Sequence, residues 1–109
     1  MDILVSRDGA IFSIEFNRPQ RRNAITVAMY AALADAIESA DGDETVRVIT
    51  LRGLGEDFTG GNDLGDFLAA MPREHDEIPV WRLLRALARN TTPLVAAVHG
   101  NAVGIGTTM

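Results

Sequence analysis

Two glycine-rich stretches contain the residue types in this sequence that could do chemistry. Gly60 and Gly61 lie in "FTGGNDL", after a β-prone run, and Gly104 lies in "GNAVGIG", after a second such run. Glycine loses more conformational entropy on folding than other residues, so glycines placed this way need a physical reason. Loops after strands can turn backbone N–H groups outward beside a helix N-terminus, where they stabilise negative charge. Two such loops converging on one point would form an oxyanion hole.

The spacing of the glycines leaves a plainer interpretation open. Glycine is first of all a turn residue, and both stretches could serve only tight turns and close packing. A dinucleotide-binding loop is not indicated, because "GNAVGIG" lacks the order G-x-G-x-x-G and no phosphate-loop Lys-Ser/Thr follows it. Neither His75 nor His99 is identified as an acid or a base, because no order of carboxylate, histidine and serine can be read around them.

Length and composition limit the classes of function. The 109 residues are 47% hydrophobic and 23% charged, which is typical of one modest globular domain or part of one. The net charge of −5 argues against a general attraction to nucleic acid or anionic lipid. Cysteine is absent, which excludes disulfides and thiolate chemistry. No apolar run reaches membrane-spanning length and no secretory signal is evident, so we expect a cytoplasmic protein with no nucleic-acid or membrane partner.

Alternating strands and helices are expected to position the loops. Residues 3–5 and 11–16 are β-prone and flank Asp8-Gly9, which predicts a β-hairpin. Residues 26–42 have helical periodicity, with Thr26 as the N-cap and Gly42 where a left-handed C-terminal residue is commonly needed. Residues 46–53 and 93–100 are predicted to be inner strands. This order favours a parallel or mixed sheet covered by helices.

Two further helices are expected between and after these strands. One is a short helix at residues 63–71, which Asp63 can cap. The other begins at Pro79 and has Arg82, Arg85 and Arg89 on its polar side. Its apolar stripe, which we expect to face the core, consists of Val80, Trp81, Leu84, Leu87 and Ala88. The last stretch, "GNAVGIGTTM", begins like another turn leading to a helix, so we interpret the chain as stopping within an element.

Three stretches together resemble those of a known family. They are "NRPQRRNAI" at residues 17–25, "FTGGNDL" at 58–64 and "PLVAAVHGNAVGIGTTM" at 93–109. In this order and with these intervals they are similar to the enoyl-CoA hydratase/isomerase family, the crotonase superfamily. The resemblance covers essentially the whole chain but only the N-terminal part of the family's domain, less than half of it. It implies an α/β fold, a crotonase-like spiral of ββα units, with residues 1–109 as the truncated N-terminal portion of an acyl-CoA-binding domain.

The resemblance also implies a site. The two glycine loops would polarise the thioester carbonyl of an acyl-CoA and stabilise its enolate. By motif position the oxyanion donors, and so the catalytic groups, are the backbone N–H groups of Asn62 and Ile105. In family members the loop at 17–25 and the residues around "GNDL" cradle the CoA portion, and arginine suits its phosphates. The implied substrate-binding residues are Arg21, Arg22, Ala24, Gly60, Gly61, Asn62, Asp63, Leu64, Gly104 and Ile105.

Without the resemblance, the arginines of residues 17–25 would be interpreted as a solvated loop after a strand-ending turn. Asp63 would be interpreted as a helix cap at least as readily as a ligand contact. The substrate contacts therefore rest on the resemblance alone.

A proton-transfer group is missing from the implied site. Hydratases of the family use two glutamates; the first would fall at Thr108, which cannot take that role, and the second lies beyond Met109. A threonine at the first position is similar to the isomerase-like branch, where one glutamate suffices. The resemblance therefore implies an enoyl-CoA isomerase, slightly preferred over a hydratase, whose isolated residues 1–109 are inactive.

The alternatives are a non-catalytic CoA-binding or assembly module that uses the same loops, and a purely structural role without binding. The resemblance implies no metal or redox cofactor, and coenzyme A enters only as part of the substrate. Family members are homo-oligomers, typically trimers or dimers of trimers. We also expect the apolar surface of "LVAAVHG" to be left uncovered, so that the chain self-associates or is marginally stable.

Overall fold

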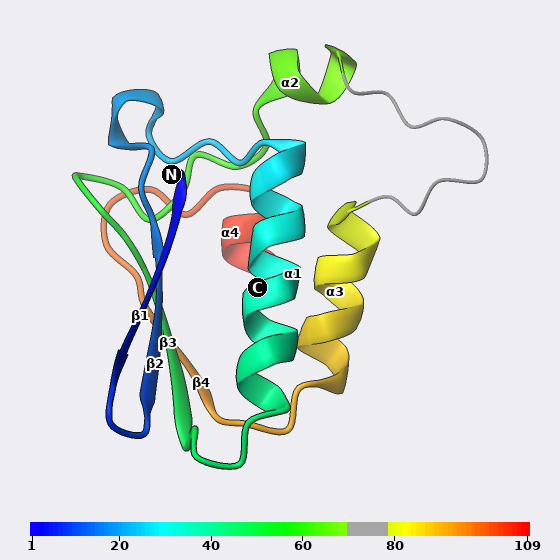
Figure 1. Ribbon diagram of the computed structural model, residues 1–109. Coiled ribbons are helices and arrows are strands. Elements are labelled where there is room, and N and C mark those ends of the chain that lie inside the picture. Colours follow the sequence, from blue (N-terminus) through cyan, green and yellow to red (C-terminus); the bar gives the residue numbers. More distant parts are fainter. Residues whose placement is uncertain (70–78) are drawn as a thin grey trace.

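The structure, a computed structural model, describes residues 1–69 and 79–109 of the chain. Its elements in chain order are β1 (Ile3–Asp8), β2 (Ile11–Phe16), the short 3-10 helix η1 (Pro19–Arg21), α1 (Val27–Asp41), β3 (Val48–Gly53), α2 (Leu64–Ala69), α3 (Pro79–Arg89), β4 (Leu94–Ala97) and α4 (Ile105–Thr108). The two longest helices, α1 and α3, lie side by side on one face of the sheet (Figure 1). The α/β fold expected from the sequence is confirmed.

In the described part of the chain the sheet has four strands, in the order β1-β2-β3-β4. β1 and β2 form the expected antiparallel hairpin around Gly9, whose φ of +59° suits glycine in a tight turn. β2 pairs with β3, and β3 with β4, in parallel. The sheet is therefore mixed. Its parallel strands β3 and β4 lead into the two glycine loops at their C-terminal ends, which lie at the same end of the sheet.

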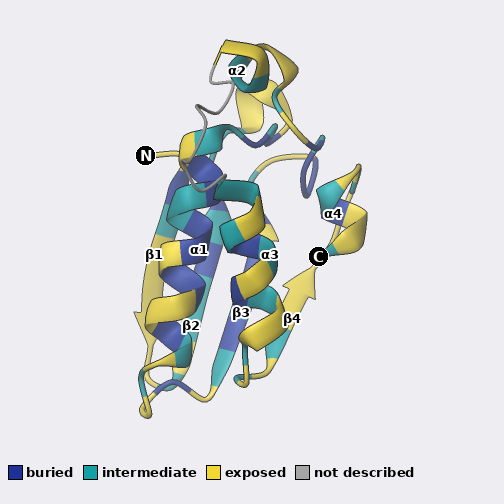
Figure 2. Ribbon diagram, turned by 90° about the vertical axis from the view of Figure 1, so that its right-hand side faces the viewer, coloured by how far each residue is buried: buried dark blue, intermediate teal, exposed yellow. Residues whose placement is uncertain are grey.

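The position of β4 corrects one expectation. Residues 93–100 were expected to form an inner strand, but among the described residues β4 lies at the edge of the sheet. Val95 and Val98 are 55% and 54% exposed, and Figure 2 shows exposed colour along β4. An apolar run indicates a tendency to be buried but does not specify what covers it. The uncovered apolar surface expected in this stretch is present.

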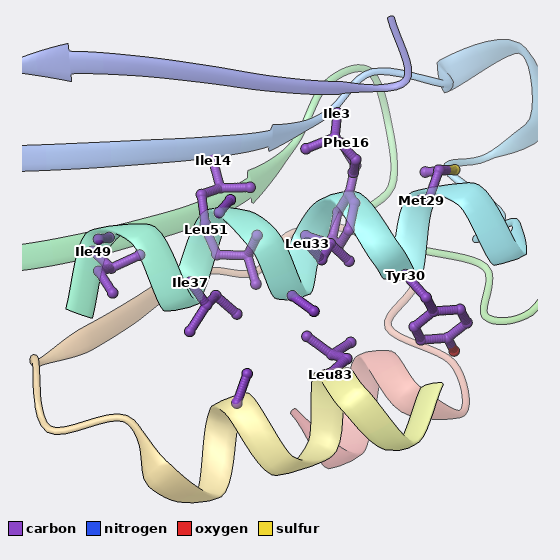
Figure 3. Packing of buried hydrophobic residues seen from close by; sticks show 14 of the residues in the cluster. Ile3, Ile14, Phe16, Met29, Tyr30, Leu33, Ile37, Ile49, Leu51 and Leu83 are labelled. Atoms are coloured by element: carbon purple, nitrogen blue, oxygen red, sulfur yellow. The ribbon is translucent and has the colours of Figure 1, made fainter. Parts of the chain in front are cut away.

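The core lies between the sheet and α1. Leu33 and Ile37 of α1 pack with Ile14, Ile49 and Leu51 of the central strands (Figure 3). Thr26 caps this helix as predicted, because its Oγ1 accepts a hydrogen bond from the Met29 N–H at 3.1 Å. The expectation for Gly42 is wrong: its φ of −80° and ψ of −4° are right-handed, so the helix ends there without a left-handed residue.

The buried face of α3 agrees with the expectation only in part: Val80 and Leu87 of the expected stripe pack against the core. Leu83 and Ala86 are buried, whereas Trp81 is 58% exposed and does not belong to the core. Arg82 faces α1 and pairs there with Asp35 at 2.5 Å and Glu38 at 2.8 Å. The helix is thus rotated from the expected stripe, since the aliphatic part of an arginine can lie along a neighbouring helix while its charge meets carboxylates.

No helix among the described residues is long and apolar enough to cross a membrane. The expected helix at residues 63–71 is present as α2 over Leu64–Ala69. Its expected last two residues and the loop that contains His75 lie outside the described residues.

Candidate functional site

The two glycine loops lie against each other. Thr59, after β3, and Ala102, after β4, form a parallel bridge in which the Thr59 N–H donates to the Asn101 carbonyl and the Val103 N–H donates to the Thr59 carbonyl, both at 3.1 Å. The Phe58 N–H donates to the His99 carbonyl at 2.8 Å just before this bridge. Two segments some forty residues apart in sequence are therefore fixed side by side at the end of the parallel strands.

A third loop, residues 17–25, pairs with the other side of the first glycine loop. The Gly60 N–H donates to the Arg22 carbonyl at 2.8 Å, and the Ile25 N–H donates to the Gly61 carbonyl at 2.8 Å. The Asp63 N–H returns a bond to the Ile25 carbonyl at 2.9 Å. The structure thus brings all three motif stretches together, with the "GGND" segment between the other two.

Backbone conformation explains two of the glycines. Gly61 has φ of +89°, and Gly104 has φ of +59° with ψ of −118° immediately before α4. Side chains disfavour both conformations. A Cβ on Gly61 would also lie 3.1 Å from the Val103 carbonyl oxygen of the neighbouring loop. These glycines are therefore required by a turn and by a close approach of two backbones.

The Asn62 N–H is available to a ligand. The Gly61 carbonyl of the same peptide unit points to the Ile25 N–H. The carbonyl and N–H of a trans peptide point in opposite directions, so the Asn62 N–H points away from Ile25. It makes no hydrogen bond within residues 1–69 and 79–109.

The Ile105 N–H is available as well. It is the first residue of α4, where backbone N–H groups have no partner inside the helix. The Gly104 carbonyl accepts from the Thr107 N–H at 3.0 Å, which turns the Ile105 N–H away from the body of the helix. This N–H has no hydrogen-bond partner in the part of the chain that the structure describes.

The side chain of Asn62 is held by Tyr30 of α1. The Tyr30 hydroxyl donates to Asn62 Oδ1, and the Tyr30 ring packs edge-on against Phe67 of α2 with the ring centroids 5.9 Å apart. Burial raises the pKa of Tyr30 to about 12, so the phenol stays neutral and remains a donor. Figure 3 shows this residue near the N-terminal end of α1. The sequence interpretation did not identify Tyr30, because its partner Asn62 lies 32 residues away in sequence.

The predicted CoA-contacting residues lie along the loops at this site. Arg21 and Arg22 are exposed, Ala24 is half-buried, and Leu64 is exposed at the start of α2. Arg22 has a left-handed φ of 52°, which is uncommon for a residue with a long side chain. The loop whose backbone pairs with Gly60 and Gly61 thus carries two exposed arginines.

Asp63 has structural partners. Its Oδ1 accepts from the Asp66 N–H at 3.0 Å, which confirms its role as a cap of α2, and its Oδ2 pairs with Arg18 Nη1 at 2.7 Å. The Asp66 N–H first, and then the Arg18 guanidinium, lower the pKa of Asp63 below its usual range. Arg18 Nη1 also donates to the Ala24 carbonyl at 3.0 Å. Arg18 was not predicted as a site residue, and the ion pair shows that it holds the loop of residues 17–25 to the start of α2.

Asn23 fixes the shape of the loop of residues 17–25. It is buried, and its Nδ2 donates to the carbonyls of Leu54 at 2.9 Å and Asp57 at 2.8 Å. Its Oδ1 accepts from the Arg18 N–H at 2.9 Å, and its φ is +55°. Asparagine tolerates the left-handed region better than most residues. Its place in "RRNAI" was visible in the sequence, but its partners more than thirty residues away were not.

Two other polar residues complete the surroundings. His99 Nε2 donates to the Gly55 carbonyl at 2.8 Å, so this histidine ties two loop segments together. The Thr108 hydroxyl donates to the Gly104 carbonyl at 3.3 Å inside α4. His75 lies outside the described residues.

A pocket of about 340 Å³ between α1 and α3 lies away from the glycine loops. Several of its polar groups have partners within the fold: Arg82 pairs with Glu38, and Asp41 Oδ1 accepts from the N–H and hydroxyl groups of Thr91 and Thr92. We interpret it as part of the helix packing rather than as the chemical site.

Comparison with known proteins gives consistent similarities. The family model described as enoyl-CoA hydratase/isomerase matches residues 6–109. "Enoyl-CoA delta isomerase 2" of Rattus norvegicus is 38% identical over 112 residues, and the match covers 98% of this chain and 28% of that protein. "Probable enoyl-CoA hydratase echA14" of Mycobacterium tuberculosis is 37% identical over 106 residues, and the match covers 95% of this chain and 41% of that protein.

Solved structures agree with this result. An enoyl-CoA hydratase/isomerase from Pseudoalteromonas atlantica T6c superposes with a TM-score of 0.92 and 39% identity, covering 99% of this chain and 43% of that one. OdaA from Pseudomonas aeruginosa superposes with a TM-score of 0.88 and 42% identity, covering 98% of this chain and 43% of that one. The chain therefore spans less than half the length of these relatives, and the fold is the corresponding part of theirs.

Proposed function

Because the chain belongs to the enoyl-CoA hydratase/isomerase family, we propose that residues 1–109 form the thioester-binding portion of an acyl-CoA enzyme. The observation that carries this proposal is the pair of backbone N–H groups of Asn62 and Ile105. Each belongs to one of two adjoining glycine loops, and neither has a hydrogen-bond partner in the described residues.

In the proposed reaction, the thioester carbonyl oxygen accepts hydrogen bonds from both amides. A base removes a proton from the carbon next to the carbonyl, and the electron pair moves onto the oxygen to give an enolate. The amides stabilise the charge that develops there; losing one such donor costs about 2.7–4 kcal/mol of transition-state stabilisation in other enzymes. Return of the proton two carbons further along moves the double bond from position 3 to position 2 of the acyl chain.

Isomerisation is slightly preferred over hydration. The residue at the first glutamate position of hydratases is Thr108, whose hydroxyl is neither a base nor an acid at neutral pH. A similarity to a delta isomerase of rat supports the same preference. We propose that a glutamate outside residues 1–109 transfers the proton, so that these residues alone bind the substrate without turning it over.

The CoA portion is proposed to lie along residues 17–25, where Arg21 and Arg22 can meet its phosphates. Gly60 and Gly61 let the backbone approach the thioester, while Asp63 acts on the ligand only through the loop it anchors. No metal or redox cofactor takes part in the proposed reaction. The intact protein is proposed to be a homo-oligomer, a trimer or hexamer, that works in fatty acid metabolism in the cytoplasm.

The test compares residues 1–109 with a chain extended by the sequence that follows in its gene. Both are titrated with acetyl-CoA by calorimetry and assayed for conversion of 3-enoyl-CoA to 2-enoyl-CoA. We expect both to bind and only the extended chain to turn over. Equal turnover by residues 1–109 would show that their base is not missing. Binding without turnover by the extended chain would favour a non-catalytic CoA-binding module, and absence of binding by either would refute the proposed function.

A further inference from the structure

Thr59 lies where all three loops of the site meet. It is fully buried, with 0% of its surface exposed. Its backbone makes both hydrogen bonds of the bridge to residues 101–103. It is thus the point at which the second glycine loop is joined to the first, and its side chain lies inside that junction.

The hydroxyl of Thr59 binds the loop of residues 17–25 and fixes the backbone of the first glycine loop. Thr59 Oγ1 donates to the Asn23 carbonyl at 2.7 Å and accepts the Gly61 N–H at 3.1 Å. The Gly61 carbonyl is held by the Ile25 N–H. Both ends of Gly61 are therefore fixed, and with them the peptide unit that carries the Asn62 N–H.

The methyl group of Thr59 faces α4. A Cβ built on Gly106 would lie only 2.5 Å from Thr59 Cγ2, and its next nearest neighbours would be 3.7 Å and 3.8 Å away. Gly106 is buried and follows Ile105 in the first turn of α4. The absence of a side chain at this glycine therefore lets the first turn of α4 approach Thr59 Cγ2 closely.

We propose that Thr59 is the positioning residue of the oxyanion site: its hydroxyl orients the Asn62 amide, and its methyl group sets the place of the Ile105 amide through Gly106. One side chain then fixes both donors with respect to each other. The inference rests on the proposed function for its chemical meaning, but the packing of Thr59 against Gly106 can be tested without any ligand.

The two halves of the side chain can be removed separately. Thr59→Val keeps the shape and removes the hydroxyl, while Thr59→Ser keeps the hydroxyl and removes the methyl group. Thr50→Val is the matched control, because Thr50 Oγ1 also makes a hydrogen bond, at 2.9 Å to Ser13 Oγ, on strands away from the loops. Gly106→Ala is made alone and together with Thr59→Ser, since the serine leaves room for the added methyl group.

Amide resonances in nitrogen–proton correlation spectra of residues 1–109 give the first measurement. We expect Thr59→Val to shift the Asn62 resonance, Thr59→Ser to leave it and shift that of Ile105, and Thr50→Val to move neither. Gly106→Ala alone should displace the Ile105 resonance and lower the unfolding midpoint. In the double variant, the Ile105 resonance and the unfolding midpoint should both return toward their wild-type values. The proposal is overturned if Thr59→Val leaves the Asn62 resonance unmoved. It is also overturned if Gly106→Ala lowers the unfolding midpoint by the same amount with and without Thr59→Ser.

Titration with acetyl-CoA, using free CoA as the control, gives the second measurement. We expect Thr59→Val to weaken binding of the thioester by about tenfold, as for the loss of one positioned hydrogen bond, with little change for free CoA. Failure of wild type to bind the thioester would refute the proposed function, while the resonances would still decide whether Thr59 positions the two amides. Normal binding by wild type and Thr59→Val alike would overturn the role of Thr59 and leave the proposed function standing.

Discussion

Gly61 and Val103 face each other across the two loops of the site, and a side chain on Gly61 would lie 3.1 Å from the Val103 carbonyl oxygen. The contact is between backbones, and φ of Gly61 is +89°. A Cβ at position 61 would therefore push the two backbones apart by a few tenths of an ångström and would strain the backbone of this residue. Asn62 follows Gly61 on one of these loops, and Ile105 follows Gly104 on the other.

Gly61→Ala should destabilise the fold. The left-handed φ alone costs about 1–3 kcal/mol for a residue with a side chain, and the close carbonyl oxygen adds to it. We expect a lower free energy of unfolding in urea. Gly42→Ala is the control: the φ of Gly42 is −80° and its nearest contact for a Cβ is an ordinary 3.4 Å, so alanine should stabilise by about 0.4–1 kcal/mol. Equal losses at both positions would contradict this account of Gly61.

Tyr30 should ionise only at strongly alkaline pH. Burial raises its pKa from 10.0 to about 12, so the neutral phenol is favoured in the folded state. Its contribution to stability is fully present below pH 10.0 and is lost as the pH rises through about 12. Because Tyr30 is the only tyrosine, phenolate absorbance reports on it alone. A native chain that titrates at the same pH as the chain unfolded in urea would disprove the burial of this hydroxyl.

Asn23→Ala should be among the most damaging single substitutions in the loop of residues 17–25. It removes the partners of three backbone groups, and a buried group left unpaired costs about 1–3 kcal/mol. The change is measured by urea unfolding. Asn17→Ala is the matched control, since Asn17 Nδ2 makes one exposed bond to the Met1 carbonyl, and we expect a change within about 0.5 kcal/mol. Similar values for the two variants would show that Asn23 does not hold the loop.

Asp63 should contribute to the loss of stability in acid. Its pKa is lowered, first by the Asp66 N–H and then by Arg18, so its contribution is present above its unfolded pKa of 3.8 and is lost as the pH falls through the lower folded value. Asp63→Asn should flatten the dependence of the unfolding free energy on pH in this range. Arg18→Ala should flatten it less, because the Asp66 N–H remains. A steeper dependence in Asp63→Asn than in wild type would contradict a lowered pKa of Asp63 in the folded state.

Much of the fold follows from local patterns in the sequence. Asp8-Gly9 between β-prone runs predicts the hairpin, and Thr26 with the periodic residues after it predicts α1, because both signals lie within a few neighbouring residues. The two glycine loops were identified from glycines that follow β-prone runs, and the family resemblance identified the fold, which the structural comparisons confirm. The roles of the Asn62 and Ile105 amides stay predictions, supported by their lack of partners among the described residues.

Long-range contacts could not be predicted in the same way. Leu83 and Leu84 are both apolar, so the pattern of α3 does not decide which one faces the core. Arg82 turns toward α1 because its carboxylate partners lie there. Asn23 Nδ2 and Thr59 Oγ1 each donate to a carbonyl more than thirty residues away in sequence. A sequence motif identifies such residues but does not show which groups they bind.

The most direct test of the central claim removes one proposed donor and little else. Proline is well tolerated at the first position of a helix, and Ile105 holds that position in α4 with an N–H that has no partner in the described residues. Ile105→Pro therefore deletes the donor, while Ile105→Ala keeps it and shortens the side chain. The measurement is the infrared carbonyl stretch of isotope-labelled acetyl-CoA bound to each protein. We predict a lowered frequency in wild type and Ile105→Ala and a smaller lowering in Ile105→Pro; an equal lowering in all three, or none in wild type, would contradict the claim.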